Sequence, residues 1–288
     1  MILHRYINCL RLNARLAWLA ARGRWLSRED VARGYDAVAP SYETEWLAQI
    51  RPVTDVLLDR LPDIPPGAIM DLGCGTGYTT ARLAARYANR PIIAVDISEG
   101  MLAKARAIAT DNTVEFVQGD MLENLQARET GDAALVFTAW AIGYSRPAAI
   151  IHESGRVLAR DGIFAFVVNR MDTLGPVFRA FRRCMARFPN ETRRALWPRF
   201  PRTAEELERA MRQAGLTTLW NDEGRIEIAP RAGMKRLDWL LRTGALAGFD
   251  AVLPLREGGP VADYFEGCLR ADPEPICHHY VAAIARKG

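Results

Sequence analysis

The sequence predicts an α/β fold, a doubly wound sheet with an N-terminal helical segment and a mostly helical cap formed by insertions. Short apolar runs typical of strands alternate with helical patterns between residues 68 and 168, which predicts a parallel sheet with helices on both faces. A glycine-rich turn directly follows the first apolar run. Residues 221–279 separate the last two expected strands, and this stretch is too long for a simple loop.

The element pattern can be followed along the chain. Strands are expected at 68–72, 92–96, 113–117, 133–138, 163–168, 216–220 and 280–285. Helices are expected at 51–61, 79–88, 98–109, 147–158 and 203–214. Ser98 should cap one helix, and Thr203 with Glu206 forms a capping-box pattern at another. The pair Asp161-Gly162 predicts a turn before the fifth strand.

Composition narrows the class of protein. Of the 288 residues 49% are apolar and 25% charged, which is ordinary for a globular chain of one large domain. The net charge of +4 is too mild to favour a nucleic-acid partner. Five cysteines without a CxxC pair predict no metal site. No run of 18 apolar residues occurs and arginines interrupt the N-terminus, so we expect a cytoplasmic protein without a transmembrane helix or signal peptide.

The N-terminal segment, residues 1–34, begins with a helical pattern over 2–26. Residues 1–28 contain six arginines and no acid, so this helix is basic and amphipathic. Such a helix can lie on an anionic membrane surface, which makes peripheral membrane contact through residues 1–28 one hypothesis. The alternative is a helix that packs on the domain with its arginines in water.

Residues 35–288 form the predicted main domain, with cap insertions at 172–202 and 221–279. The stretch 178–202 contains eight arginines, and five large aromatic residues stand among them. These five are Phe178, Phe181, Phe188, Trp197 and Phe200. Arginine recognises carboxylate or phosphate, and aromatic rings contact flat or apolar groups. The stretch therefore favours an acceptor with an apolar body and an anionic or phenolic group, although a solvated helix face would have the same composition.

The glycine-rich turn has the sequence Asp71-Leu72-Gly73-Cys74-Gly75-Thr76-Gly77. Glycines at a strand-to-helix turn let the backbone bend sharply and approach a ligand without Cβ clashes. A dinucleotide-binding loop requires G-x-G-x-x-G, but the third position here is Tyr78. The turn instead has the pattern G-x-G-x-G, with an acid two residues before its first glycine.

Three further motifs follow at strand ends. The second strand ends in Asp96, which could accept hydrogen bonds from ribose hydroxyls. The third is followed by Gly119-Asp120-Met121, and the fourth runs through Thr138 to Trp140. Together with the glycine turn, these motifs resemble the class I S-adenosylmethionine-dependent methyltransferases, in particular the ubiquinone/menaquinone methyltransferase-like, small-molecule subgroup, over about residues 35–170.

The resemblance implies a Rossmann-like, seven-stranded sheet and methyl transfer from S-adenosyl-L-methionine to a small-molecule acceptor, lipophilic or aromatic like a quinone precursor or a lipid. By resemblance, Asp96 binds ribose, Asp120 and Met121 contact adenine, and Tyr35 and Tyr42 form an N-terminal gate. The implied cofactor-binding residues are Tyr35, Tyr42, Asp71, Gly73, Cys74, Gly75, Thr76, Gly77, Asp96, Ile97, Met101, Gly119, Asp120, Met121 and Thr138.

The acceptor side is less specific. Trp140 and Tyr144 follow the fourth strand and are the candidates for lining the acceptor pocket. Among candidate bases, His152 is expected at the surface, and His278 and His279 are expected to be structural, at the end of the sheet opposite to the active-site loops. Alternative functions are a non-catalytic S-adenosylmethionine-binding regulator and a methyltransferase for a phospholipid amine or for a metalloid held by Cys184, Cys268 and Cys277.

Overall fold

The computed structural model describes residues 2–108, 113–196 and 199–288, and it describes the side chains of the first helix from Asn8 onward. The chain forms two compact units. The first comprises Met1–Trp46, Leu174–Trp197 and Glu227–Cys277, and the second comprises Leu47–Thr173, Pro198–Ile226 and His278–Gly288. The first unit thus gathers the N-terminal segment and most of both predicted insertions. The predicted boundary after residue 34 stays a prediction.

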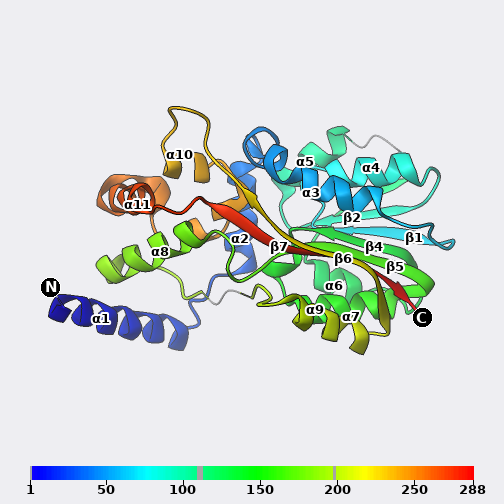
Figure 1. Cartoon of the computed structure of the whole chain (residues 1–288), viewed down its shortest axis with the longest axis horizontal. Coiled ribbons are helices and arrows are strands. Elements are labelled where there is room, and N and C mark those ends of the chain that lie inside the picture. Colours follow the sequence, from blue (N-terminus) through cyan, green and yellow to red (C-terminus); the bar gives the residue numbers. More distant parts are fainter. Residues whose placement is uncertain (1, 109–112, 197–198) are drawn as a thin grey trace. The chain divides into compact units, whose positions relative to one another are not determined.

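The second unit is built on a seven-stranded sheet with the order β3-β2-β1-β4-β5-β7-β6 (Figure 1). Its strands are β1 (Ala68–Leu72), β2 (Ile92–Asp96), β3 (Val114–Gln118), β4 (Ala133–Ala139), β5 (Leu158–Asn169), β6 (Leu216–Glu227) and β7 (Cys277–Lys287). Neighbours from β3 to β5 pair in parallel, whereas β7 runs antiparallel to β5. The carboxyl ends of β1, β2, β4 and β5 therefore share one edge with the start of β7.

Helices cover both faces of this sheet, with α3, α4 and α5 on one side and α6, α7 and α9 on the other (Figure 1). Their bounds are α3 (Ala48–Asp59), α4 (Tyr78–Arg86), α5 (Glu99–Ile108), α6 (Met121–Gln126), α7 (Pro147–Val157) and α9 (Ala204–Gln213). Phe164 and Phe166 of β5 are fully buried in the same apolar cluster as Ile150 of α7 and Leu207 of α9. Each such side chain contributes about 1.5–3 kcal/mol by leaving water.

The predicted alternation of strands and helices is confirmed, and two local predictions are wrong. Ser98 caps α5 as expected, because its hydroxyl accepts from the Met101 N–H at 3.1 Å. Asp161, however, lies inside β5 at φ 62°, where the pairing with β4 shifts register, so the expected turn is a bulge in a longer strand. Thr203 makes no side-chain capping bond to α9, and Glu206 accepts from the Arg202 N–H instead.

The first unit is helical. Its α-helices are α1 (Ile2–Ala21), α2 (Arg28–Val38), α8 (Gly175–Arg187), α10 (Arg236–Leu240) and α11 (Gly259–Ala271). Its 3₁₀ turns are Pro189–Glu191, Gly244–Leu246, Phe249–Ala251 and Leu255–Glu257. A π-helical turn, Glu43–Leu47, leads from this unit into the second. Phe181 of α8 packs on Phe265 of α11 at 5.1 Å between ring centroids, and Trp239 of α10 is fully buried. The long predicted insertion is thus a packed helical structure, as the expected helical cap requires.

The first helix ends five residues earlier than expected. Gly23 takes φ 64°, and the Arg24 N–H donates to the Leu19 carbonyl, a left-handed stop that favours glycine. Ser27 then begins α2 with a capping box closed by Asp30. Across the described ranges, no helix combines the length and apolarity needed to cross a membrane.

Ion pairs within the first unit use several arginines of the predicted cap. Arg179 contacts both carboxylate oxygens of Asp272 at 2.8 Å, and this hydrogen-bonded guanidinium lowers the pKa of Asp272. Arg194 contacts the buried Asp30 at 3.0 Å, and Arg193 pairs with Glu257. These three arginines therefore connect segments of the first unit that are distant in sequence.

Gly155 of α7 packs closely against Ala214, the residue that ends α9. A Cβ added there would lie 2.5 Å from the Ala214 carbonyl oxygen, which is backbone and has little room to move. We expect Gly155→Ala to lower the free energy of unfolding by about 1–3 kcal/mol through overpacking. Urea unfolding measures this change. The control is Gly267→Ala in α11, where nothing lies within 4 Å, and which should be neutral or stabilising by up to about 1 kcal/mol. Equal changes in the two variants would contradict the packing argument.

Candidate functional site

The glycine turn between β1 and α4 adopts a left-handed backbone at all three glycines. Gly73, Gly75 and Gly77 have φ values of 70°, 56° and 89°. Cβ atoms at Gly73 and Gly77 would collide with Ala141 and Ala105, at 2.3 Å and 2.8 Å respectively. Nothing lies within 4 Å of a Cβ built on Gly75. Two glycines are therefore needed for packing, while the third faces open space in which a ligand can approach the backbone.

Asp71, at the end of β1, fixes the start of α4 from below the turn. It is 1% exposed, and its Oδ2 accepts hydrogen bonds from the hydroxyls of Thr79 and Thr80 at 2.7 Å each. Oδ1 has no hydrogen-bond partner among the described residues. Burial raises the pKa of Asp71 to about 6, although the two hydroxyls act in the opposite direction.

Asp96, at the end of β2, connects the second strand to the glycine turn. Its Oδ2 accepts from the Gly75 N–H at 2.8 Å, and its Oδ1 accepts from the Ser98 N–H at 2.9 Å. The carboxylate therefore both closes its own turn and orients the glycine that faces open space. Ile97 beside it is half-buried.

The motif after β3 begins α6. Asp120 is its N-cap, and one carboxylate oxygen accepts from the Leu122 and Glu123 N–H groups at 2.9 and 3.1 Å. The preceding Gly119 N–H donates to the Asp96 carbonyl, which brings this motif beside the second. The Met121 methyl lies 3.8 Å from a Cβ built on Gly73. Motifs that are far apart in sequence therefore meet at one edge of the sheet.

Several predicted cofactor residues are buried beneath this edge. Cys74 and Met101 are 5% and 1% exposed, and burial raises the pKa of the Cys74 thiol well above its usual range, which disfavours the reactive thiolate. Thr76 and Thr138 are also buried, and their hydroxyls have no hydrogen-bond partner in the described part of the chain. Such hydroxyls are suited to hydrogen-bonding a polar ligand at this edge.

Trp140, the first residue after β4, has an unusual backbone. Its φ is 64°, a left-handed conformation that costs a bulky residue about 1–3 kcal/mol. The indole is 8% exposed, and its Nε1–H donates to the Thr54 hydroxyl of α3 at 3.0 Å. The hydrogen bond to Thr54 thus keeps a strained aromatic side chain in one orientation. Trp140 lies beside the glycine turn, because the next residue, Ala141, contacts Gly73.

His278 lies against Trp140, which corrects the sequence-based expectation. The two rings are 5.5 Å apart, and the register pairs Tyr280 of β7 with Asn169 at the end of β5. Because β7 is antiparallel, its first residues lie at the carboxyl edge and not at the opposite end. His278 is 1% exposed, and its Nδ1 lies 2.6 Å from Asn169 Oδ1. Burial lowers its pKa to about 3, so the imidazole is neutral at physiological pH.

Other candidates are placed as follows. Tyr144 is half-buried and packs edge-on against Phe200, with 6.1 Å between centroids, so Phe200 belongs to this edge and not to the cap. His279 lies 2.8 Å from Asp172. His152 is at the surface, as predicted, with 67% of its side chain exposed. Trp197 lies outside the described residues.

Tyr35 and Tyr42 belong to the first unit, whereas the glycine turn belongs to the second. Their rings contact edge-on at 6.3 Å between centroids, and Tyr42 also lies beside Gly244. Their gating role stays a prediction. Cys184 and Cys268 are buried in the first unit, and the described residues contain no group of three or more histidine, cysteine or acidic side chains arranged to bind a metal ion.

The chain is similar to known methyltransferases. Residues 69–162 match a protein family described as Methyltransferase domain. A malonyl-[acyl-carrier protein] O-methyltransferase of Nitrosospira multiformis is 30% identical over 178 residues, which cover 55% of this chain and 57% of that protein. The protein of the same name from Geobacter sulfurreducens is 29% identical over 210 residues, 71% of this chain and 77% of that protein.

The chain spans little more than half the length of the Nitrosospira multiformis protein that it matches. Among solved structures, the [4+2]-cyclase SpnF superposes with a TM-score of 0.56 at 19% identity, covering 91% of this chain and 97% of that one. At this identity the likeness concerns the fold alone.

The buried carboxyl of Asp71 should make folding stability depend on pH. Because its pKa is raised from 3.8 to about 6, the folded state binds more protons than the unfolded state between these values, and stability decreases as pH rises through this window. We expect Asp71→Asn, which cannot ionise, to gain roughly 1 kcal/mol of unfolding free energy relative to the wild type between pH 5 and pH 7.5. Urea unfolding of both proteins at the two pH values measures the gain, and a difference that does not change with pH would refute the pKa assignment.

Proposed function

We propose, since this chain carries a domain of the class I S-adenosylmethionine-dependent methyltransferase family, that it transfers a methyl group from S-adenosylmethionine to a small-molecule acceptor. One observation supports this most directly: the open glycine turn contacts the residue that follows the strained Trp140. A cofactor over Gly75 and an acceptor against Trp140 would therefore be neighbours. Methyl transfer requires this neighbourhood, because the reacting atoms must be aligned in line.

The cofactor roles follow from the polar groups at the edge. Gly73, Gly75 and Gly77 would form the cradle for the methionine part, and Thr76 and Thr138 offer hydroxyls. Asp96 would bind the ribose while it orients Gly75, with Ile97 beside it. Asp120, between Gly119 and Met121, would accept from the adenine amine. Cys74 and Met101 would contribute through packing, since both are buried. When bound, S-adenosylmethionine supplies a methyl group already activated by its sulfonium.

The acceptor side contains aromatic rings but no base suited to neutral pH among the residues flanking Trp140. The pKa of His278 is lowered to about 3, and burial, with Asp222, raises the pKa of Tyr280 to about 12. A base is needed only if the acceptor atom is protonated. The site therefore favours an acceptor whose oxygen is already ionised, such as a carboxylate. The malonyl group and trans-aconitate named for the relatives both contain carboxylates.

The rest of the acceptor should be flat or apolar. Trp140, Tyr280, Tyr144 and Phe200 present ring faces or edges at this end of the sheet. Aromatic walls contact apolar or planar groups, which supports the lipophilic or aromatic acceptor that the sequence favoured. We therefore propose a small carboxylate with a planar or apolar body as the substrate class.

The cofactor assignment is tested by calorimetric titration with S-adenosylmethionine, S-adenosylhomocysteine and NADH. We expect binding of the first two and none of NADH.

Asp96→Ala should weaken S-adenosylhomocysteine binding about 10- to 100-fold, because two charge-assisted hydrogen bonds are lost, each worth about 1.5–3 kcal/mol, while the variant loop partly adapts. The control, Glu115→Ala, removes an exposed acid from the adjacent strand. Binding of NADH alone, or equal affinities in the two variants, would reject the assignment. Cofactor binding without turnover of any acceptor would leave a non-catalytic regulator.

The acceptor assignment is tested by activity. We expect kcat/KM for a carboxylate acceptor to be independent of pH between 7 and 9, because neither His278 nor Tyr280 titrates there and Asp71 titrates below this range. Trp140→Phe, which loses the hydrogen bond to Thr54, should lower kcat/KM roughly 10- to 100-fold through misplacement of the acceptor, with cofactor affinity retained. Trp220→Phe, a half-buried tryptophan stacked on Arg60, is the control. A bell-shaped profile or an unaffected Trp140→Phe enzyme would contradict the assignment.

A further inference from the structure

The first helix of the chain has two apolar faces, of which only one is covered. Leu12, Leu16 and Leu19 face inward, and Leu19 is fully buried where α1 packs on α8 and on the 3₁₀ turn Pro189–Glu191. A second face remains exposed and consists of Leu10, Ala14, Ala17, Trp18 and Ala21 at helical spacing. Leu10 is 68% and Trp18 43% exposed, which leaves large apolar side chains in water without an internal reason.

A row of arginines borders this exposed face. Arg11, Arg15 and Arg22 follow one another at helical spacing. The guanidinium carbons of Arg15 and Arg22 lie 4.7 Å and 5.2 Å from the centre of the Trp18 ring. Arg15 is also fixed by a hydrogen bond from its Nε to the Thr192 carbonyl at 3.0 Å. Positive charge is thus concentrated along one edge of the apolar face.

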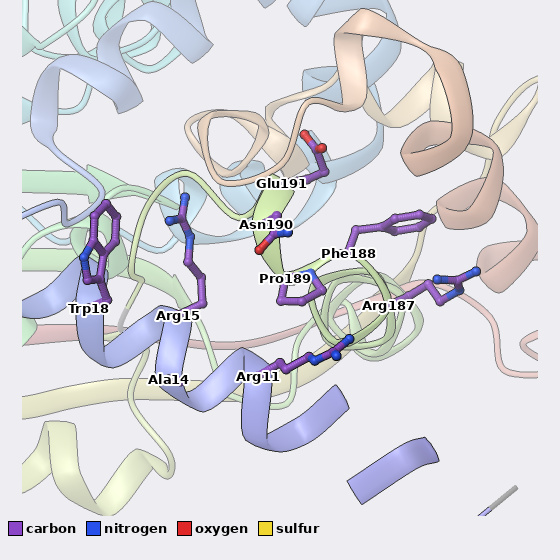
Figure 2. A pocket seen from close by; sticks show the side chains of 9 residues that line it. All are labelled: Arg11, Ala14, Arg15, Trp18, Arg187, Phe188, Pro189, Asn190 and Glu191. Atoms are coloured by element: carbon purple, nitrogen blue, oxygen red, sulfur yellow. The ribbon is translucent and has the colours of Figure 1, made fainter. Parts of the chain in front are cut away.

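The arginine row continues into a cleft within the first unit (Figure 2). The cleft has a volume of about 780 Å³ and is lined by residues of α1 on one side and by residues 187–191 on the other. Arg11, Arg15 and Arg187 contribute three positive charges, and Asn190 adds an amide. Glu191 is the one acid of the lining, and it also lies near Arg193. No ion pair joins Arg11, Arg15, Arg22 or Arg187 to an acid among the residues that the structure describes.

We propose that α1 and this cleft form a binding surface for a membrane that contains anionic phospholipids. The exposed face of Leu10 and Trp18 would enter the boundary between headgroups and acyl chains. The arginine row would then lie at headgroup level, and the cleft would receive a lipid phosphate. Guanidinium groups bind phosphate well, and tryptophan is favoured at membrane interfaces. An apolar face flanked by arginines is typical of helices that lie in the plane of a membrane surface.

An acidic protein would match the charge of the cleft but not the neighbouring face. Such a partner would be attracted by Arg11, Arg15 and Arg187, whereas Leu10 and Trp18 require apolar cover at the same time. A lipid surface provides anionic headgroups and an apolar layer within a few ångströms of each other. The combination therefore favours lipid over an acidic protein.

The test is sedimentation of the full-length protein with vesicles of phosphatidylglycerol and phosphatidylcholine in a 3:7 ratio, and with pure phosphatidylcholine vesicles. We expect binding to the anionic vesicles alone, and its loss in 0.5 M salt. Arg11→Gln combined with Arg187→Gln should lower the binding constant roughly 25-fold, about fivefold for each basic residue near an anionic surface. The control pair, Arg209→Gln with Arg225→Gln, removes the same charge from exposed positions of the second unit and should change it little.

A matched pair of variants tests the apolar face. Leu10→Ser should reduce vesicle binding roughly tenfold, whereas Leu219→Ser, at a position 45% exposed on β6, should not. Unchanged binding of S-adenosylhomocysteine verifies that each variant is folded. Absence of binding to anionic vesicles, or equal losses in the test and control variants, would overturn the proposal. So would a cleft variant that binds vesicles normally but loses affinity for an acyl carrier protein, since the cleft would then be a protein-docking surface.

Discussion

The candidate site depends on two carboxylates at adjoining strand ends that fix one turn of backbone. Asp71 accepts hydrogen bonds from the hydroxyls of Thr79 and Thr80 beneath the turn, and Asp96 accepts one from the N–H of Gly75. Without these bonds, three left-handed glycines at alternate positions would have too many accessible conformations to present a defined surface. Because Gly73 also contacts Ala141, the same two carboxylates determine where the end of β4 lies relative to the turn.

The sheet was predictable because its signals are local. Apolar runs, glycines and Ser98 each indicate their own structure within a few residues. The edge with the glycine turn follows because the carboxyl ends of parallel strands must meet. The errors arose where local signals met a longer-range constraint. Asp161-Gly162 has the composition of a turn, but β5 pairs with β4 on both sides of it, at Leu158 and at Ile163, so the pair lies in a bulge inside the strand. Thr203 has the residue type of a cap, but its hydroxyl does not reach the helix backbone.

The acceptor side was less predictable because strand direction cannot be read from a strand's own residues. His278 was expected at the wrong end of the sheet, since only the antiparallel pairing of β7 with β5 brings it to Trp140. In the same way, the eight arginines of 178–202 do not reveal which of them have acidic partners. Arg179, Arg193 and Arg194 pair within the first unit, whereas Arg187 lines a cleft, and these differences depend on acids that are distant in sequence.

The left-handed backbone of Trp140 has a consequence for protein engineering. Glycine at this position would release about 1–3 kcal/mol of backbone strain but would also remove the indole. Removing the buried indole would cost about 3–5 kcal/mol, which is more than the strain released, so a smaller residue at position 140 would not stabilise the fold. Laboratory evolution of a more robust variant would do better to leave residues 138–141 fixed and to search for stabilising changes elsewhere.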